Sequence, residues 1–264
     1  MQKSKISGSF GELTYNIHQG GKEILLAFHG FGQNGEALLP LIQSLLPDYT
    51  IFSFNLFFHG SIWKLRDKPL EKNVWEEILN SFFTKHNIGT FTLLGFSLGA
   101  KISLVTYTLF PDRVSRMVLL APDGISTNLW YNLATYPHFF RDYFKSMIVQ
   151  PKRFYSILNA LTRMNLVDRG LIRFAANQMN TASKRHKVYY SWVVYRRFQL
   201  SQKELILLAN KSNCKFTFWL GTYDKVITKE RIQSFAQKLP NSEVRVLDCG
   251  HNDLIQKAAY ALSD

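Results

Sequence analysis

The sequence predicts an α/β protein: a mostly parallel, twisted sheet flanked by helices and interrupted by one all-helical insertion. Short apolar runs alternate with amphipathic stretches over residues 23–122 and again from residue 215 onward. This alternation is typical of parallel strands joined by right-handed helical crossovers. Residues 125–204 instead show one helical pattern after another. The 264 residues are enough for one large domain with a substantial core.

The elements before the insertion follow from apolar periodicity. Residues 9–18 and the Gln-Gly-Gly-Lys after them predict an antiparallel edge hairpin. Apolar runs of strand length occupy 23–28, 50–55, 90–96 and 113–121. Helical periodicity covers 35–46, 71–86 and 98–110.

The insertion and the end of the chain follow in the same way. Helices are expected after Pro151, which suits a first helical position, and over 168–179 and 182–197. Ser201 and Glu204 form a capping box that starts another helix. Strands at 215–220 and 243–247 and helices at 229–239 and after residue 252 complete the frame. We therefore predict an α/β core of residues 1–123 and 205–264, with residues 124–204 as a helical cap, or lid.

Composition excludes several classes of protein. With 46% hydrophobic and 19% charged residues, the chain is neither disordered nor collagen-like. Two cysteines are too few for a disulfide framework. No apolar run approaches the roughly 18 residues that span a bilayer, and no secretory signal is visible. We therefore expect a cytoplasmic protein without an integral membrane segment.

Positive charge is concentrated in the predicted insertion. The net charge is +13, and residues 125–204 hold 13 of the 32 Lys and Arg residues but 3 of the 19 Asp and Glu residues. The charge of this segment is either simply solvated, or it attracts acidic substrates, or it gives weak association with anionic surfaces. Nucleic-acid binding is not expected, because no nucleic-acid module accompanies the charge.

One motif carries chemistry. Gly95-Phe96-Ser97-Leu98-Gly99 is a G-x-S-x-G sequence at the end of a predicted strand and the start of a predicted helix. A turn this sharp forces the serine to a positive φ and needs small residues two positions before and after it. Gly95 and Gly99 meet that need. Ser97 is therefore the candidate nucleophile.

With this motif in this order of elements, the chain resembles a capped α/β-hydrolase over nearly its whole length. The family's chain order is nucleophile, acid, histidine, which implies Asp224 as the acid and His251 as the base. His251 would take the serine proton, and Asp224 would hold the imidazole in the useful tautomer. Asp123 is the alternative acid, because some relatives keep the acid after the strand that ends here at Ala121.

The same resemblance implies further site residues. His29-Gly30-Phe31-Gly32 is similar to the family's HGxG loop, so the backbone N–H groups of Phe31 and Leu98 would form the oxyanion hole. Residues 58–61 resemble its GHGxS turn, with Phe58 where glycine is usual, and His59 is expected to be structural. Candidate substrate-binding residues are His29, Phe96 and Lys101, together with two residues of the aromatic insertion, Trp130 and Trp192, which either line an apolar pocket or are ordinary packing of the cap.

The expected activity is that of a serine hydrolase of carboxylesterase or thioesterase type. It would cleave a small, largely apolar or anionic acyl substrate through an acyl-Ser97 intermediate, without a metal or an organic cofactor. Two alternatives stay open. One is a lyase that uses the same serine, histidine and aspartate and resembles the menaquinone-pathway synthase that expels pyruvate. The HGF loop of that synthase is similar to residues 29–31, and its basic residue after the nucleophile motif is similar to Lys101. The other is a slow-turnover ligand receptor of the same fold.

Overall fold

The chain divides into two compact units. A computed structural model describes all residues except 126–137, 165–166, 168 and 264. The first unit contains Met1–Lys64, Leu70–Ser126 and Arg197–Asp264, and the second contains Leu65–Pro69 and Thr127–Arg196. The predicted insertion, residues 124–204, overlaps the second unit without matching its bounds. The segments 124–126 and 197–204 belong to the first unit, and the short segment Leu65–Pro69 belongs to the second.

The first unit is built on a mixed sheet. Within the described residues it has nine strands in the order β1-β2-β4-β3-β6-β7-β8-β9, with β5 paired to β2. Their bounds are β1 Gln2–Gly8, β2 Gly11–His18, β3 Glu23–Phe28, β4 Tyr49–Phe54, β5 Ile62–Trp63, β6 Phe91–Phe96, β7 Val114–Leu120, β8 Lys215–Gly221 and β9 Ser242–Leu247. The six strands in the order β4-β3-β6-β7-β8-β9 pair in parallel, and β2 is antiparallel to its three neighbours β1, β4 and β5. The predicted fold class is confirmed.

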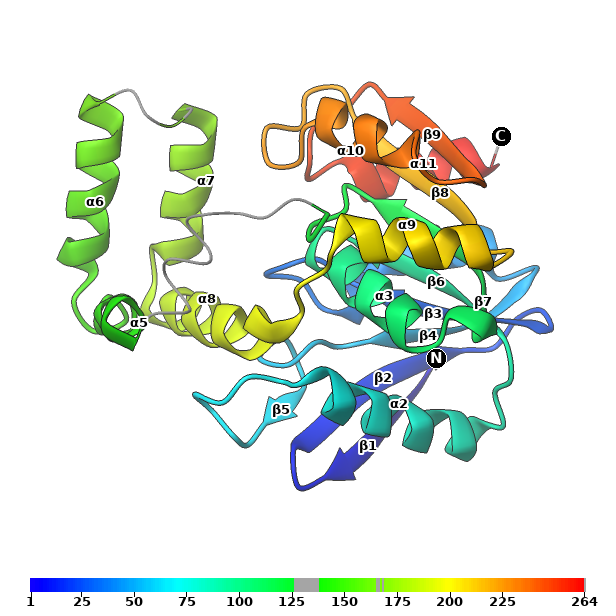
Figure 1. Ribbon diagram of the computed structural model, residues 1–264. Helices are drawn as coiled ribbons and strands as arrows, with labels where there is room; N and C mark the ends of the chain where they lie inside the picture. Colours follow the sequence, from blue (N-terminus) through cyan, green and yellow to red (C-terminus); the bar gives the residue numbers. More distant parts are fainter. Residues whose placement is uncertain (126–137, 165–166, 168, 264) are drawn as a thin grey trace. The chain divides into compact units, whose positions relative to one another are not determined.

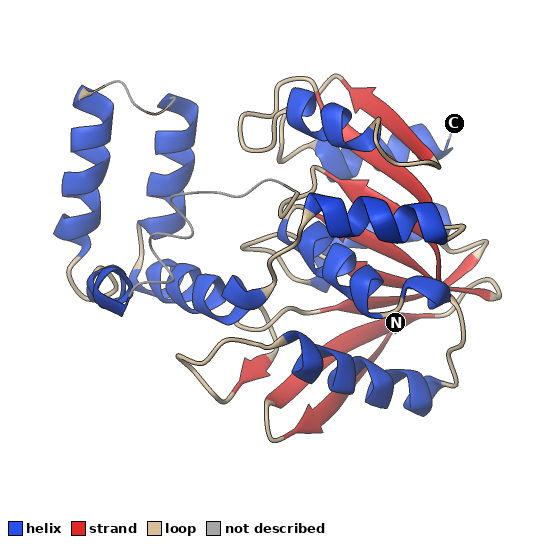
Figure 2. Ribbon diagram, viewed as in Figure 1, coloured by secondary structure: helices blue, strands red, loops and turns tan. Residues whose placement is uncertain are grey.

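Helices cover both faces of this sheet. In Figure 1, α2, α3 and α9 lie on the face toward the viewer. On the other face, α1 and α11 pack against each other, with Leu41, Ile42, Ala258 and Ala259 in their shared core. The helical segments of this unit are η1 Gly35–Leu38, α1 Leu39–Leu45, α2 Lys72–His86, α3 Leu98–Leu109, η2 Pro111–Arg113, α9 Gln202–Lys211, α10 Lys229–Ala236 and α11 Leu254–Ser263. Figure 2 shows the resulting layers of helix and strand.

Local chemistry sets several helix boundaries. Residues 35–46 were expected to form one helix, but they begin with a 3₁₀ turn, and α1 starts only at Leu39. Pro40 has no N–H to donate, so it is tolerated only in the first turn of an α-helix. Helix α2 ends at Asn87 with a left-handed φ of 51°. The N-cap hydrogen bond of the predicted capping box is present at α9, where Ser201 Oγ accepts from the Glu204 N–H at 3.4 Å.

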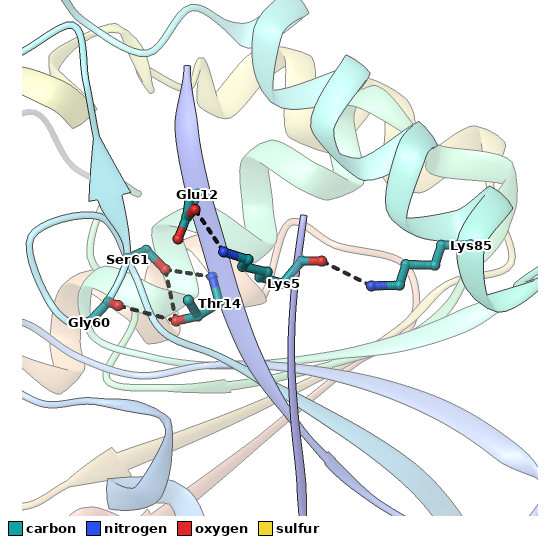
Figure 3. Close-up of polar contacts among 6 residues, drawn as sticks. All are labelled: Lys5, Glu12, Thr14, Gly60, Ser61 and Lys85. Atoms are coloured by element: carbon teal, nitrogen blue, oxygen red, sulfur yellow. Dashed lines mark hydrogen bonds and ion pairs between the residues drawn. The ribbon is translucent and has the colours of Figure 1, made fainter. Parts of the chain in front are cut away.

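The N-terminal hairpin begins earlier than expected. Its first strand is β1, whereas the sequence indicated a hairpin over residues 9–18. In Figure 3, Lys5 Nζ lies 2.8 Å from a carboxylate oxygen of Glu12 on β2, and Lys85 Nζ donates to the Lys5 carbonyl at 2.9 Å. These contacts tie the edge strand both to its neighbour and to α2.

A second group of contacts in Figure 3 fastens the loop after β4 to β2. The Thr14 N–H donates to Ser61 Oγ at 2.8 Å, and Thr14 Oγ1 donates to the Gly60 carbonyl at 3.2 Å. Ser61 Oγ in turn donates to the Asn55 carbonyl at 2.6 Å. The loop is therefore closed on itself and held in place by the sheet.

The second unit is helical in its described part. Its helices are α5 His138–Ser146, α6 Pro151–Arg163, α7 Arg169–Met179, α8 Ala182–Val194 and the 3₁₀ turn η3 Tyr195–Arg197, whose last residue belongs to the first unit. Asp67 explains why the segment Leu65–Pro69 joins these helices: its carboxylate accepts hydrogen bonds from Lys145 Nζ at 2.7 Å and from the Tyr189 hydroxyl at 3.3 Å. No helix in the described part of the chain is long and apolar enough to cross a membrane.

Candidate active site

Ser97 occupies a strained turn between β6 and α3. Its φ of 52° and ψ of −114° confirm the predicted positive φ. The Ser97 N–H donates to the Leu120 carbonyl at 2.9 Å, and its own carbonyl accepts from the Ala100 N–H at 3.0 Å. Because such a backbone costs of order 1–3 kcal/mol, it persists only where the surrounding structure fixes it.

The two motif glycines allow this turn to pack. A Cβ on Gly95 would lie 2.5 Å from the Ala100 Cα, and a Cβ on Gly99 would lie 2.0 Å from the Phe28 carbonyl oxygen. No side chain can occupy either space without moving backbone. The glycine spacing of the motif is therefore required by the close approach of α3 to β3 and β6.

His251 and Asp224 meet the serine in one hydrogen-bonded line. His251 Nε2 lies 3.2 Å from Ser97 Oγ, and His251 Nδ1 lies 2.6 Å from Asp224 Oδ2. The other carboxylate oxygen, Oδ1, accepts the N–H groups of Val226 and Ile227 at 2.8 Å each. Asp224 is buried, so its carboxylate is both desolvated and held at three points. Because a carboxylate accepts, the proton on this imidazole is placed on Nδ1 and the Nε2 lone pair faces the serine.

Asp123, the alternative acid, forms hydrogen bonds with backbone groups near Ser97. Its N–H donates to the Ser97 carbonyl at 3.2 Å, and its Oδ1 accepts from the Gly124 N–H at 2.8 Å. The adjacent Lys101 is buried in α3; burial lowers the pKa of its ammonium group, and the Asp123 carboxylate acts in the opposite direction. The carboxylate in contact with His251 is thus that of Asp224.

Two buried histidines shape the loop after β3. His29 Nε2 accepts the Leu56 N–H at 3.0 Å, so its proton is on Nδ1, which donates to the Gly30 carbonyl at 2.7 Å. His59 Nε2 accepts the Gly32 N–H at 2.9 Å, and its Nδ1 donates to the Phe57 carbonyl at 3.1 Å. Each histidine therefore uses both ring nitrogens to bind backbone, and together they connect the loop after β3 with the loop after β4.

The predicted oxyanion donors have free N–H groups in this arrangement. Within the described residues, the N–H groups of Phe31 and Leu98 donate to no other protein group. Leu98 is the first residue of α3, where the N–H groups lack intrahelical partners and the helix dipole favours negative charge.

The remaining predicted contact residues lie in different places. Phe96 is buried with its ring centroid 5.0 Å from that of His251, tilted by 37°. Trp192 is in α8 of the second unit, where its ring lies 5.4 Å from that of Phe144. Trp130 lies outside the described residues. Among the described residues, no group of three or more His, Cys, Asp or Glu side chains is placed to hold a metal ion.

Two backbone features in or near the site were not predicted. The Val226 and Ile227 N–H groups that hold Asp224 are backbone donors, so no residue type signals them. Phe58 adopts a φ of 63°, in the left-handed region that favours glycine. The signal for that strain was present in the sequence, because phenylalanine stands there where the similar turn of the family has glycine.

A family model described as the alpha/beta hydrolase fold matches residues 23–258. This chain therefore belongs to the α/β-hydrolase fold family, and the predicted membership is confirmed. Curated proteins to which this chain is similar carry hydrolase and esterase names.

Similarity to individual proteins is weaker. The chain is 29% identical over 114 residues to the 2-(acetamidomethylene)succinate hydrolase of Mesorhizobium japonicum, covering 42% of this chain and 40% of that protein. It is 28% identical over 107 residues to the (E)-2-((N-methylformamido)methylene)succinate hydrolase of Acinetobacter baylyi, covering 40% of each. The matches thus span less than half of these curated relatives. The fold is also similar to a solved esterase of Thermogutta terrifontis with malate bound, at a TM-score of 0.72 and 16% identity over 99% of this chain and 96% of that one.

Proposed function

We propose that this protein is a serine esterase, acting on an ester or thioester through an acyl-Ser97 intermediate. The observation that carries the proposal is the hydrogen-bonded line from Ser97 Oγ through His251 to Asp224, with distances of 3.2 and 2.6 Å. A serine hydroxyl is a weak nucleophile at neutral pH unless a base takes its proton during attack. The unprotonated Nε2 of His251 is positioned to be that base.

The proposed reaction then follows from where the protons move. Ser97 Oγ attacks the acyl carbon while its proton passes to His251 Nε2, which later gives that proton to the leaving group. Asp224 stabilises the imidazolium formed in between. The N–H groups of Phe31 and Leu98 would bind the developing oxyanion, and loss of one such donor typically costs about 2.7–4 kcal/mol of transition-state stabilisation. Water then hydrolyses the acyl enzyme by the same steps.

Other buried residues of the site are proposed to position it. Both ring nitrogens of His29 are occupied by backbone groups, which suits a residue that fixes the Phe31 loop better than one that contacts substrate. Phe96 packs against the His251 ring, and a Cβ on Gly30 would lie 2.7 Å from the Phe96 ring. Phe96 therefore sets the spacing between the proposed base and the proposed oxyanion loop.

The experiment that tests the esterase proposal pairs active-site labelling with turnover. A fluorophosphonate probe reports an activated serine, and a panel of acyl esters of increasing chain length reports hydrolysis. We expect labelling together with turnover of at least one ester. Labelling without turnover of any ester would contradict the esterase proposal and favour the lyase or the receptor.

The substrate class that we propose is an acyl compound carrying a carboxylate. Residues 125–204, most of which form the helical unit and which correspond to the proposed cap, hold 13 Lys and Arg residues against 3 Asp and Glu residues. Such a charge raises the local concentration of an anion and speeds its capture. Two relatives are named for succinate derivatives, and a similar esterase structure has malate bound. Succinates and malate are dicarboxylates at neutral pH, in agreement with an anionic substrate.

Salt should therefore separate charged from neutral substrates. We expect kcat/KM for a carboxylate-bearing ester to fall as salt rises, because the Debye length shortens from about 10 Å at 0.1 M to about 3 Å at 1 M. A neutral ester of the same length should respond little. If both esters respond alike, the charge does not select substrate.

A pair of charge variants completes this test. Lys184→Gln with Lys187→Gln should flatten the difference between the two esters, and the exposed pair Lys211→Gln with Lys238→Gln in the first unit is the matched control. Arg185 is left in place because it is buried and donates to the carbonyls of Ile148 and Met179 at 3.0 and 3.1 Å.

A further inference from the structure

Large apolar side chains are exposed along α5 and in the turn that joins α5 to α6. Phe139 is 77% exposed and Val149, in the turn between the two helices, is 83% exposed. Phe140 and Tyr143 are also exposed. Single exposed apolar residues are ordinary, but a group of them marks an interaction surface. We call the surface formed by Phe139, Phe140, Tyr143, Val149, Lys152 and Arg153 the α5–α6 corner.

Contacts link the aromatic side chains of α5 to the start of α6. The rings of Phe139 and Phe140 meet edge to face at 5.6 Å, and Tyr143 lies one helical turn after Phe139. The Arg153 guanidinium from α6 lies 5.6 Å from the centre of the Tyr143 ring. Arg153 also donates to Ser146 Oγ at 2.5 Å, which fixes the start of α6 against the end of α5.

The corner belongs to a strongly cationic unit. Residues 65–69 and 127–196 contain 13 Lys and Arg residues and 3 Asp residues. One of those acids, Asp67, is already paired with Lys145. Asp142 is the exposed acid next to the corner, where Lys152 is exposed and Arg153 half-buried. Basic residues near an anionic membrane surface each strengthen binding by about fivefold.

We propose that the α5–α6 corner binds the surface of an anionic lipid bilayer. Aromatic side chains favour the headgroup level of a membrane, and short amphipathic helices with basic polar faces lie in that interface. Both features occur together here, in helices of 9 and 13 residues. A nucleic acid would account for the charge and for an exposed aromatic ring, but not for the exposed aliphatic side chain of Val149. This role is independent of the proposed esterase activity.

Vesicle co-sedimentation of the full chain tests the proposal. We expect the protein to bind vesicles containing phosphatidylglycerol, to bind pure phosphatidylcholine vesicles at least tenfold less, and to be released from the first by 1 M salt. Phe139→Ser with Val149→Ser should weaken binding at least tenfold. The matched control is Leu207→Ser with Tyr260→Ser, two side chains of the first unit that are 62% and 60% exposed.

A variant that should increase vesicle binding keeps the proposal testable if Phe139→Ser with Val149→Ser fails to fold. Val149→Trp should strengthen vesicle binding, because tryptophan partitions into the interface better than valine. Ser97→Ala should bind vesicles like the unmodified chain, whether or not the esterase proposal holds.

Three results would overturn the lipid proposal. They are absence of binding to the anionic vesicles, equal loss in the serine pair and in its control, and a dimer in solution that the serine pair dissolves. The last result would assign the corner to a second copy of this chain.

Discussion

Ser97→Ala is expected to abolish labelling by a fluorophosphonate probe and to reduce ester turnover by at least about 10³-fold. The reason is that Ser97 Oγ is the hydroxyl in contact with His251 Nε2, at 3.2 Å. What remains would come from oxyanion binding and substrate positioning. The fold should be little changed, because alanine removes one atom from a crowded turn and adds none.

The control for this variant is on the same helix. Ser103 is a buried serine of α3, whose hydroxyl donates to the Gly99 carbonyl at 3.1 Å. Ser103→Ala should keep both labelling and most of the turnover. Labelling that persists in Ser97→Ala would place the nucleophile elsewhere and contradict the assignment.

Asp224→Asn is expected to lower turnover by about 10⁴-fold while leaving the melting temperature nearly unchanged. The amide oxygen can still accept the N–H groups of Val226 and Ile227, which now bind Oδ1 at 2.8 Å each. The amide nitrogen would then face His251 Nδ1 and donate to it. The imidazole proton then moves to Nε2. A protonated Nε2 has no lone pair with which to accept the proton of Ser97.

Asp123→Asn is the matched comparison. Its carboxylate accepts from the neighbouring Gly124 N–H at 2.8 Å, and an amide oxygen can do the same. We expect turnover within about tenfold of the unmodified protein, since no triad proton depends on this side chain. Steady-state kinetics of the two variants side by side decide the question, and a larger loss in Asp123→Asn would make Asp123 the acid.

The central sheet could be predicted because its strands are buried on both faces. Strands such as β6, in which every residue is buried, appear in the sequence as continuous apolar runs. The edge strands of the sheet were harder to predict from the sequence. Of the seven residues of β1, only Ile6 is buried, so its pairing with β2 depends on backbone hydrogen bonds that leave no periodic pattern. Strand β5 has only two residues, which is too short for any periodic pattern in the sequence.

The site divides in a similar way. Ser97, Asp224 and His251 were found from a motif and a chain order, and the structure brings their side chains together. The place of Leu65–Pro69 in the helical unit could not be predicted from the sequence. It depends on Asp67, whose hydrogen-bond partners Lys145 and Tyr189 lie 78 and 122 residues further along the chain.

The seam between β7 and β8 has a consequence for how this chain could be divided. Residues Arg116 to Leu120 pair in parallel with Lys215 to Trp219, and all described residues of the helical unit except the segment Leu65–Pro69 come between these strands in the sequence. The proposed nucleophile Ser97 precedes the seam, whereas the proposed acid and base follow it. A chain cut between α5 and α8 would therefore separate the proposed nucleophile from the proposed acid and base, and hydrolysis would report the reassociation of the two halves through the β7–β8 pair and the packing of α1 on α11.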